Sequence, residues 1–522
     1  MSTVEIEQRS LLQKVLDWIE RVGNKVPHPV IIFLILIGAI MVLSAIFQAA
    51  GSSVTFEQAQ LGADDVQTVT VAARSLLDAD GLRFVFTSPV ANFNSFGVVG
   101  VILVAMIGVG MAEEVGLIQA FIKRLVKVTP ARAITFIIVL LGVLSSIATD
   151  AGYLVLIPLS AAVFLSLGRH PLAGLAAAFA GVGGGFAVNI LITPVDGMLA
   201  QITNEAIADP ANHVSITGNL YFGIASTLLV AVVATILTEK FVEPRLGPYH
   251  PSEGPETAAT EAPSGELSPE EKNGLRWAFW GFVGVTVVVL LLTIPPNAVL
   301  RNPETGSLIE NSPFLNSIIF LILIYFFVMG LCYGRAAGTI TGSMDVINPM
   351  TKTIAGLSGL IFLLLVISQF IAYFNYSNLG TIAAVNMADA LENANLSTVW
   401  LIIGLIAVTA VIDIFIGGVV PKWAIFAPVF VPLFIQLGIS PDLAMAAYRV
   451  GDSPVNVATP LMPYFALIVI FAERYRRKVG VGSVISLMLP YTVVLLVTWS
   501  ALLVVWYLLG IPLGPGASIY LH

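Results

Sequence analysis

The feature that most constrains this chain is the recurrence of apolar stretches long enough to cross a lipid bilayer. A transmembrane helix needs about 20 predominantly apolar residues. Only 11% of the chain is charged, against about 25% in soluble domains. A bilayer can cover so much apolar surface, whereas water cannot. We therefore predict an all-α polytopic membrane protein. Its apolar runs are 29–49, 96–116, 133–167, 171–203, 218–238, 277–296, 314–334, 354–376, 399–437, 442–473 and 481–510.

Two of these runs, 133–167 and 399–437, are too long for one crossing and too short for two. Each has small or polar residues in its middle, at 145–150 and 417–422. Irregular backbone at membrane depth is tolerated only inside protein or beside water, so we predict two re-entrant helical hairpins. With both hairpins, every Lys and Arg cluster falls on the cytoplasmic side, as the positive-inside rule requires. This topology has nine transmembrane helices, a cytoplasmic N-terminus and a periplasmic C-terminus.

The chain divides into two membrane halves. Residues 1–28 are predicted to form a cytoplasmic amphipathic N-terminus, and the Pro-, Glu-, Ser- and Gly-rich segment 243–275 a cytoplasmic linker. The first half, 29–242, contains hairpin 133–167 and a broken helix over 171–203. The second half, 276–522, contains hairpin 399–437 and a broken helix over 442–473.

The two halves share a repeat at a spacing of 270 residues. Tyr153, Pro158, Gly168 and Pro171 are matched by Trp423, Pro428, Gly438 and Pro441. The charge pattern opens the first hairpin to the cytoplasm and the second to the periplasm, so the repeats are predicted to be inverted. Inverted repeats with discontinuous helices are a recurrent plan of secondary transporters, whose binding sites lie near the midplane.

Small and polar residues interrupt the last span of each repeat. Residues 181–185 hold four glycines and are followed by Asn189 and Thr193-Pro194, while Asn456 and Thr459-Pro460 occupy the second half. Glycine lets backbone unwind and expose carbonyls, although small residues also permit close helix packing in membranes. We favour broken helices. Asn189 and Asn456 then either ligate a cation or supply the hydrogen bonds that a broken helix needs.

Ionisable residues inside membrane spans are costly and are functional candidates by default. Arg449 and Asp452 lie three residues apart and are predicted to face each other, as a binding site or as a structural pair. Asp196 is the counterpart in the first half. Asp413 and Lys422 flank the tip of the second hairpin, where Lys422 either serves function or extends toward solvent. Asp150 lies at the tip of the first hairpin. Trp423 is a candidate to stack on an aromatic substrate or to pack the tip.

Other classes of function find little support in the sequence. Cys332 is the only cysteine, and the five histidines are scattered, so no metal site and no cofactor are expected beyond a coupling ion, H⁺ or Na⁺. No basic stripe suggests nucleic-acid binding. An intramembrane enzyme would need a nucleophile–base set or a metal cluster in the spans, which the sequence does not display.

Several motifs together resemble the AbgT-type p-aminobenzoyl-glutamate transporter family. They lie at 168–178, 239–249, 369–375, 447–453, 459–460 and 510–517. The resemblance implies a homodimer in the bacterial inner membrane, and uptake of p-aminobenzoyl-glutamate or proton-driven export of sulfonamide antimetabolites. It places the family's functional residues on Asp196, Trp423, Arg449, Asp452, Pro441 and Pro460.

Two positions depart from the family pattern. Val420 stands where the family usually has serine, and Asp413 where it usually has asparagine. An added buried carboxylate is a candidate proton carrier. We therefore expect an ion-coupled secondary transporter, a symporter or an antiporter, of a small aromatic carboxylate. Arg449 would hold the anion, and Asp196, Asp452 and Asp413 would couple the ion. A dicarboxylate or other organic-anion symporter of related architecture is the alternative, and a channel is less favoured.

Overall fold

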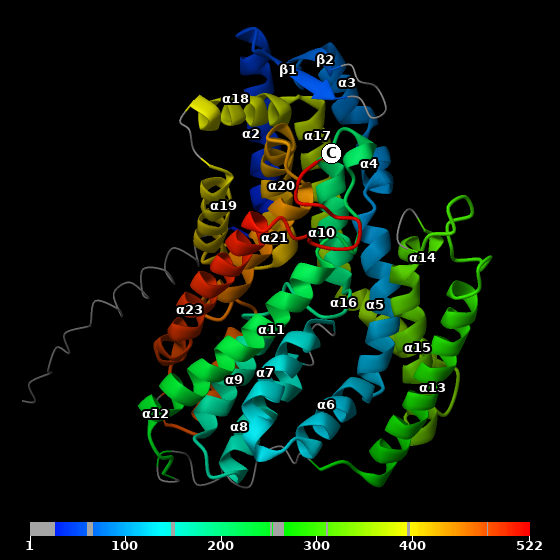
Figure 1. The fold of residues 1–522 in the computed structure, drawn as a ribbon, viewed down its shortest axis with the longest axis vertical. Helices are drawn as coiled ribbons and strands as arrows, with labels where there is room; N and C mark the ends of the chain where they lie inside the picture. Colours follow the sequence, from blue (N-terminus) through cyan, green and yellow to red (C-terminus); the bar gives the residue numbers. More distant parts are fainter. Residues whose placement is uncertain are drawn as a thin grey trace, which may run out of the picture.

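The fold is described from a computed structural model of the 522-residue chain. The described residues are 27–59, 66–147, 152–250, 253, 266–308, 312–393, 397–477 and 479–521. Asp150, nearly all of the predicted amphipathic segment 1–28 and much of the linker 243–275 lie outside these ranges. Helices dominate the described chain (Figure 1), which confirms the predicted all-α polytopic class.

Seven helices in the described ranges are long and apolar enough to cross a bilayer, and nine if each of two bent helix pairs counts as one span. One of the seven, Val419–Gln436, was predicted as the second arm of the second hairpin. The runs predicted as broken helices, 171–203 and 442–473, are not among the seven. The count of nine crossings with two hairpins therefore stays a prediction. The seven are α2 (Pro29–Ala49), α11 with its extension (Leu220–Leu246), α13 (Pro269–Thr293), α15 (Ile318–Ala337), α17 (Ser358–Tyr376), α20 (Val419–Gln436) and α23 (Val481–Leu508).

The first bent pair joins α4 (Pro89–Ser95) to α5 (Val98–Glu114) at 48°. The second joins α6 (Leu117–Val128) to the segment Ala131–Ile147 at 116°. The predicted apolar runs omit 117–132, but the apolar residues of α6 recur at helical spacing and bury one face, including Leu117, Ala120 and Ile122. Its Lys123 lies 2.9 Å from Glu271 at the start of α13.

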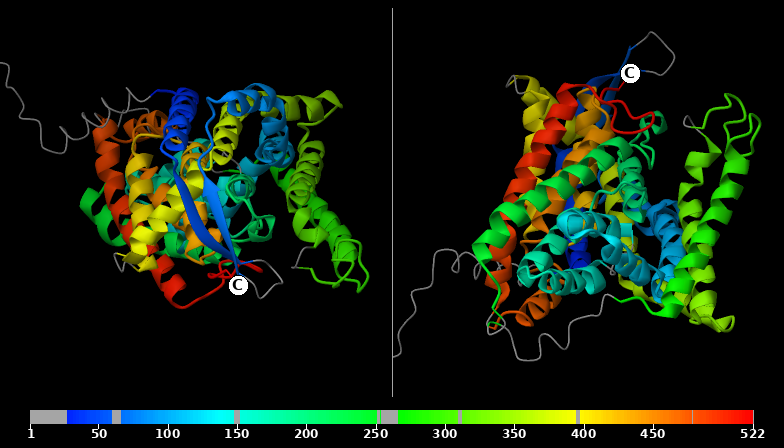
Figure 2. Two further views of the ribbon diagram at one scale, coloured as in Figure 1. Left: turned by 90° about the horizontal axis from the view of Figure 1, so that it is seen from above. Right: turned by 60° about the horizontal axis from the view of Figure 1, so that its bottom comes forward.

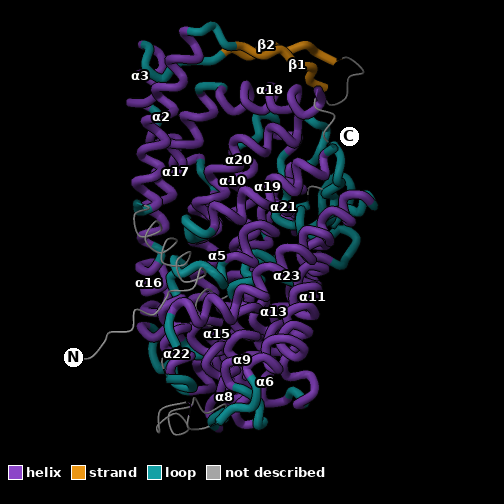
Figure 3. The backbone as a smooth tube through the Cα atoms, turned by 90° about the vertical axis from the view of Figure 1, so that its left-hand side faces the viewer, coloured by secondary structure: helices purple, strands orange, loops and turns teal. Residues whose placement is uncertain are grey.

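The two ends of the molecule differ in content (Figures 1 and 3). The antiparallel hairpin of β1 (Ser53–Ala59) and β2 (Val66–Ala72) lies at one end, together with α3 (Ala79–Thr87), α18 (Leu379–Asn393) and the C-terminus. At the opposite end lie α6, α8 (Ile157–Ser166), α12 (Glu243–Leu246) and α22 (Phe465–Glu473). α6 carries Lys123, Arg124 and Lys127, and α12 carries Arg245, side chains that the positive-inside rule places in the cytoplasm. Which end faces the cytoplasm stays a prediction.

Both predicted hairpin runs consist of two helical arms. The first arm of the first run is α7 (Ile134–Leu144) with the 3-10 turn η2 (Ser145–Ile147), and its second arm is the π-helical turn η3 (Gly152–Leu156) leading into α8. The second run consists of α19 (Thr398–Asp413) and α20. The first run follows α6 and the second follows α18, so they begin toward opposite ends of the molecule (Figure 1).

The runs predicted as broken helices are each two helices in the structure. The first is α9 (Pro171–Val182) and α10 (Pro194–Glu205); the second is α21 (Pro441–Asp452), the 3-10 turn η7 (Ser453–Val455) and α22. Adding 270 to the bounds of α9 gives the bounds of α21. Gly168 and Gly438 precede them with φ of +70° and +69°, a backbone conformation that glycine adopts without strain. The two helices therefore share their length and the glycine turn that precedes them, while the inverted repeat of the two halves stays a prediction.

Glycine also decides how α9 and α21 pack on the first arm of each hairpin. A Cβ on Gly181 would lie 2.4 Å from the carbonyl oxygen of Val139, and one on Gly451 would lie 2.6 Å from that of Ile406. These two glycines are themselves 270 residues apart, a match beyond the four pairs identified from the sequence. Gly181 thus permits close packing inside α9, and the interruption begins at Gly183, where the helix ends.

A second group of helices forms one edge of the molecule (Figure 2). α13 and α15 pack together, and α5 joins them to the remainder. α13 begins at Pro269, earlier than the linker boundary predicted at 275, because Ser268 and Glu271 form a capping box around its first turn. Its outer face is apolar and exposed, with Phe279 59% and Leu291 66% accessible, as expected for a face covered by lipid. The remaining helices are α14 (Pro313–Asn316) and α16 (Met344–Gly356).

Candidate functional site

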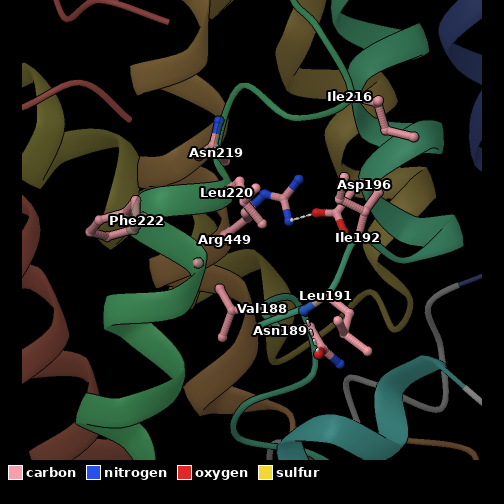
Figure 4. Close-up of a pocket in the computed structure, with 11 residues that line it drawn as sticks. Val188, Asn189, Leu191, Ile192, Asp196, Ile216, Asn219, Leu220, Phe222 and Arg449 are labelled. Carbon is pink, nitrogen blue, oxygen red and sulfur yellow. Dashed lines mark hydrogen bonds and ion pairs between the residues drawn. The ribbon is translucent and has the colours of Figure 1, made fainter. Parts of the chain in front are cut away.

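The interrupted helices of the two halves meet at Arg449. This residue lies in the last turn of α21, and its side chain is only 3% exposed. Its Nη1 donates to Asp196 Oδ1 at 2.5 Å and to the carbonyl oxygen of Ala187 at 2.8 Å. The amide of Ala187 donates in turn to Ser453 Oγ at 3.1 Å. Ala187, in the break of the first half, is therefore hydrogen-bonded to the second half through both its amide and its carbonyl oxygen. Figure 4 shows the pair of Arg449 and Asp196.

Asp196 is positioned by the start of α10. Thr193 is the N-cap of that helix, and the two residues form a capping box in which Asp196 Oδ2 accepts from the Thr193 amide at 2.7 Å and its hydroxyl at 2.8 Å. A carboxylate in the first turn of a helix is stabilised by the positive end of the helix dipole. The second oxygen, Oδ1, remains for Arg449, so helix capping aims Asp196 at its partner.

A second group of buried charges surrounds Lys422 in the first turn of α20. Its Nζ lies 2.7 Å from Asp452 Oδ1 and also pairs with Asp413 Oδ1. The side chains of Lys422 and Asp413 are fully buried, and that of Asp452 is 1% exposed. Tyr448, one turn before Asp452 on α21, places its hydroxyl 2.9 Å from Asp452 Oδ1. Three helices, α19, α20 and α21, thus supply one charge each.

These contacts correct two predictions. Arg449 and Asp452 do not pair with each other: Arg449 reaches α10 in the other half, whereas Asp452 binds Lys422 and Tyr448. A spacing of three residues allows two side chains of one helix to touch. Each of these side chains instead pairs with a charged residue on another helix, Arg449 with Asp196 and Asp452 with Lys422. The interpretation that Lys422 extends toward solvent is also wrong, because its ammonium is enclosed between two carboxylates.

Trp423 lies in the core rather than at an accessible surface. Its ring is 0% exposed and packs at 4.8 Å from the ring of Tyr448. Its indole N–H donates to Thr203 Oγ1 of α10 at 3.0 Å. The ring therefore joins the second hairpin to both interrupted helices. Its predicted stacking on substrate would require this packing to open.

Polar residues in the two breaks bind the first arms of the hairpins. Asn189 Nδ2 lies 3.2 Å from the carbonyl oxygen of Leu144 and 3.0 Å from Ser146 Oγ, so it caps the end of α7. Thr459 Oγ1 donates to the carbonyl oxygen of Ile414 just after α19, at 3.0 Å. Both satisfy carbonyls that a helix end leaves without partners. For Asn189 the structure shows the hydrogen bonds that a broken helix needs.

Three further residues were predicted to belong to the site. Pro441 is the first residue of α21, with Ser440 as its N-cap. Asn456 and Pro460 lie in the break between η7 and α22 and are half-buried.

A pocket opens beside the Arg449–Asp196 pair (Figure 4). Its free volume is about 10 Å³, space for about one water molecule, so this conformation has no room for a substrate. Asn189, Asp196 and Arg449 were predicted; Asn219 and Phe222 were not. Asn219 sits at the start of α11, in a loop with no sequence signal, and its Nδ2 donates to the carbonyl oxygen of Asp442 at 3.1 Å. The lining residues are Val188, Asn189, Leu191, Ile192, Asp196, Ile216, Asn219, Leu220, Phe222, Gly223 and Arg449.

The pocket presents hydrogen-bonding capacity that the described residues do not use. Arg449 Nε has no hydrogen-bond partner among them, and Nη2 has only the sulfur of Met445, at 3.8 Å. Asn219 Oδ1 likewise lacks a donor within the described ranges. The Nε–Nη2 edge is the one with which guanidinium binds carboxylate through two parallel hydrogen bonds. No cluster of three or more His, Cys, Asp or Glu residues able to hold a metal ion occurs in the described chain.

Comparisons with known proteins agree with this architecture. The p-aminobenzoyl-glutamate transport protein of Escherichia coli (strain K12) is 36% identical over 520 residues, covering 99% of each chain. The crystal structure of the Alcanivorax borkumensis YdaH transporter is similar with a TM-score of 0.84 and 42% identity, over 94% of this chain and all of that one.

The structure of Neisseria gonorrhoeae MtrF, described as illuminating a class of antimetabolite efflux pumps, is similar with a TM-score of 0.88 and 41% identity. That match covers 96% of this chain and all of MtrF. The names of these relatives indicate a transporter rather than an enzyme. The sequence model of one family, described as the AbgT putative transporter family, matches residues 14–521. The chain therefore belongs to the AbgT putative transporter family.

Proposed function

We propose that this protein is an ion-coupled secondary transporter of p-aminobenzoyl-glutamate or a similar small aromatic carboxylate in the bacterial inner membrane. The observation that carries the proposal is the buried Arg449, whose Nε–Nη2 edge faces a pocket without an oxygen partner among the described residues. Buried donors are rarely left unsatisfied. A substrate carboxylate would complete the hydrogen bonding of this edge.

The charges at the same site support the proposed ion coupling. Arg449 carries one positive charge and already binds Asp196. A substrate carboxylate would place a second negative charge beside the same guanidinium. Because an unbalanced charge is costly in the membrane interior, we expect Asp196 to take up a proton or a sodium ion as the anion binds. Asp452 and Asp413 form the second candidate coupling group.

Alternating access would open the pocket to one side at a time. The carboxylate site is built from α21 of the second half and α10 of the first, so relative movement of the halves would change its exposure. The pocket, with a free volume of about 10 Å³, would have to widen to admit a substrate. Homodimer formation stays a proposal that rests on the family.

Flux measurements with purified protein in proteoliposomes test the proposal. Labelled p-aminobenzoyl-glutamate should enter saturably, show counterflow, and respond to an imposed ion gradient. Arg449→Lys should reduce this flux strongly, since Lys lacks the planar fork that binds a carboxylate in two places. The matched control is Arg83→Lys on the exposed side of α3, where the side chain is 74% accessible.

Two other outcomes would redirect the assignment. Faster saturable uptake of succinate, without counterflow of p-aminobenzoyl-glutamate, would favour a dicarboxylate symporter of related architecture. Export of a sulfonamide from inside-out vesicles along a proton gradient would favour an efflux pump, as the description of MtrF suggests for that protein. Absence of flux for every candidate anion would overturn the proposal.

A further inference from the structure

The Lys422 group is a second charged site, separate from Arg449. Its ammonium lies 2.7 Å from Asp452 Oδ1 and pairs with Asp413 Oδ1 as well. Asp413 ends α19, Asp452 ends α21, and Lys422 lies in the first turn of α20. The ammonium therefore occupies the position between two carboxylates that a bound metal cation would otherwise take.

The acceptors of this group outnumber its donors. Asp413 Oδ2 and Asp452 Oδ2 are buried, and neither has a hydrogen-bond donor among the described residues. The hydroxyl of Tyr448 lies 2.9 Å from Asp452 Oδ1 and 2.5 Å from the carbonyl oxygen of Val419. Its single proton can be donated to only one of them. One additional proton on a carboxyl oxygen would supply a missing donor.

The formal charges also indicate that the group can take up one additional proton. Two carboxylates and one ammonium leave one negative charge in the interior of the protein. The elements packed around the group carry four other charged residues on α21 and α10. Arg449 and Asp196 neutralise each other, and Asp442 in the first turn of α21 and Glu205 at the end of α10 are further carboxylates that supply no positive charge. α17, α23 and η7 also pack nearby and contain no charged residue, and Asp389 on α18 is exposed. The excess negative charge therefore has no partner among the described residues.

We propose that Lys422 is a tethered counter-cation that reserves the Asp413–Asp452 site for a proton and excludes sodium. This inference rests on the proposed ion coupling and names the residue that selects the ion. Sodium would have to displace the ammonium from both carboxylates, which would leave a buried Lys⁺ without a partner. A proton needs no such displacement, because it binds an oxygen that the ammonium leaves free.

The thermal midpoint of unfolding in detergent, measured in NaCl and in choline chloride at equal ionic strength, tests this selection without requiring transport. A bound ion stabilises the folded state in proportion to its occupancy. The wild type should give the same midpoint in both salts. Lys422→Gln leaves two carboxylates without a cation and should gain a saturable midpoint rise in NaCl. The matched variant Lys422→Gln with Asp413→Asn has one carboxylate and should lose that rise.

A sodium-dependent midpoint in the wild type would overturn the inference, as would equal responses of Lys422→Gln to the two salts. If Lys422→Gln does not fold, the inference is tested by the wild-type midpoints in the two salts and by transport measurements on Asp413→Asn. In Asp413→Asn the excess negative charge is gone, so uptake should be no faster with a pH gradient than without one. A ratio of the two uptake rates equal to that of the wild type contradicts the proposal. Lack of any transport by the wild type would count against the proposed function, while the midpoint comparison would still test the role of Lys422.

Discussion

Replacing Asp196 with Asn should destabilise the folded protein by removing one partner of a buried ion pair. In the wild type, Asp196 Oδ1 lies 2.5 Å from Arg449 Nη1, and the Arg449 side chain is 3% exposed. The variant would keep much of the helix cap, because an amide oxygen can still accept from Thr193. Arg449 would retain the carbonyl oxygen of Ala187 and the sulfur of Met445. Its positive charge would have no anion beside it.

The expected cost follows from the burial of the pair. Removing one partner of a buried ion pair costs about 3–5 kcal/mol, because the other charge stays buried and unpaired. Since 16% of the Asp196 side chain is exposed, water can reach part of the site, and we expect about 3 kcal/mol. The free energy of unfolding is measured by reversible denaturation in mixed detergent and SDS micelles. The exposed Asp80, which pairs with Arg83 at the surface, gives the control: Asp80→Asn should cost less than about 1 kcal/mol.

The double variant Asp196→Asn with Arg449→Met tests the cause. It removes both charges, so it should be no less stable than Asp196→Asn alone, and the two substitutions should show a coupling energy of about 2 kcal/mol. Additive losses would show that the ion pair is not the source of the effect, and would refute this reasoning.

Three further perturbations test other parts of the structure. Trp423→Phe removes the hydrogen bond to Thr203 and should cost about 1 kcal/mol of stability without raising KM; a raised KM at unchanged stability would instead indicate contact with substrate. Asn189→Ala leaves carbonyls at the end of α7 without a donor and should increase amide hydrogen exchange in 134–147; unchanged exchange would contradict its capping role. Asp345→Asn should increase exchange in α16 at neutral pH, and equal exchange in both proteins at neutral pH would contradict that expectation.

The pH dependence of the Asp345 effect follows from its hydrogen bonds. The backbone amides of Thr341 and Gly342 and the Thr341 hydroxyl donate to this carboxylate and lower the pKa of Asp345 from its ordinary value of 3.8. Because the folded-state pKa is lowered, the stabilisation is fully present above 3.8 and is lost as the pH falls through the folded-state pKa. The difference between wild type and Asp345→Asn should therefore disappear in acid.

The sequence predicts the interruptions of this fold better than its contacts. Runs of glycine and X-Pro steps mark where α9 ends and α10 and α21 begin, because these residues act on the local backbone. The repeat at 270 residues could have been extended to Gly181 and Gly451 by the same comparison. The helix at 117–128 is absent from the predicted runs because Lys and Arg residues interrupt its apolar sequence, although its apolar residues recur at helical spacing.

The partners of the buried charges could not be predicted in the same way. Arg449 binds a residue 253 positions away, and such a choice depends on how α10 and α21 cross. Spacing along a helix suggested Asp452, whose nearest cation instead comes from α20. Asn219 enters the pocket from a loop, where no periodicity marks it. The single residues were largely identifiable as candidates, but their pairing is a property of tertiary packing.

Equilibrium binding of labelled p-aminobenzoyl-glutamate to purified wild type and Arg449→Lys tests the central claim most directly. Arg449 is proposed to bind a substrate carboxylate through its free Nε–Nη2 edge. Loss of that two-point contact should weaken binding about tenfold or more, since ~1.4 kcal/mol corresponds to a factor of ten. The control variant Arg83→Lys should bind like the wild type. Equal affinity of Arg449→Lys and wild type would contradict the claim that Arg449 binds the substrate.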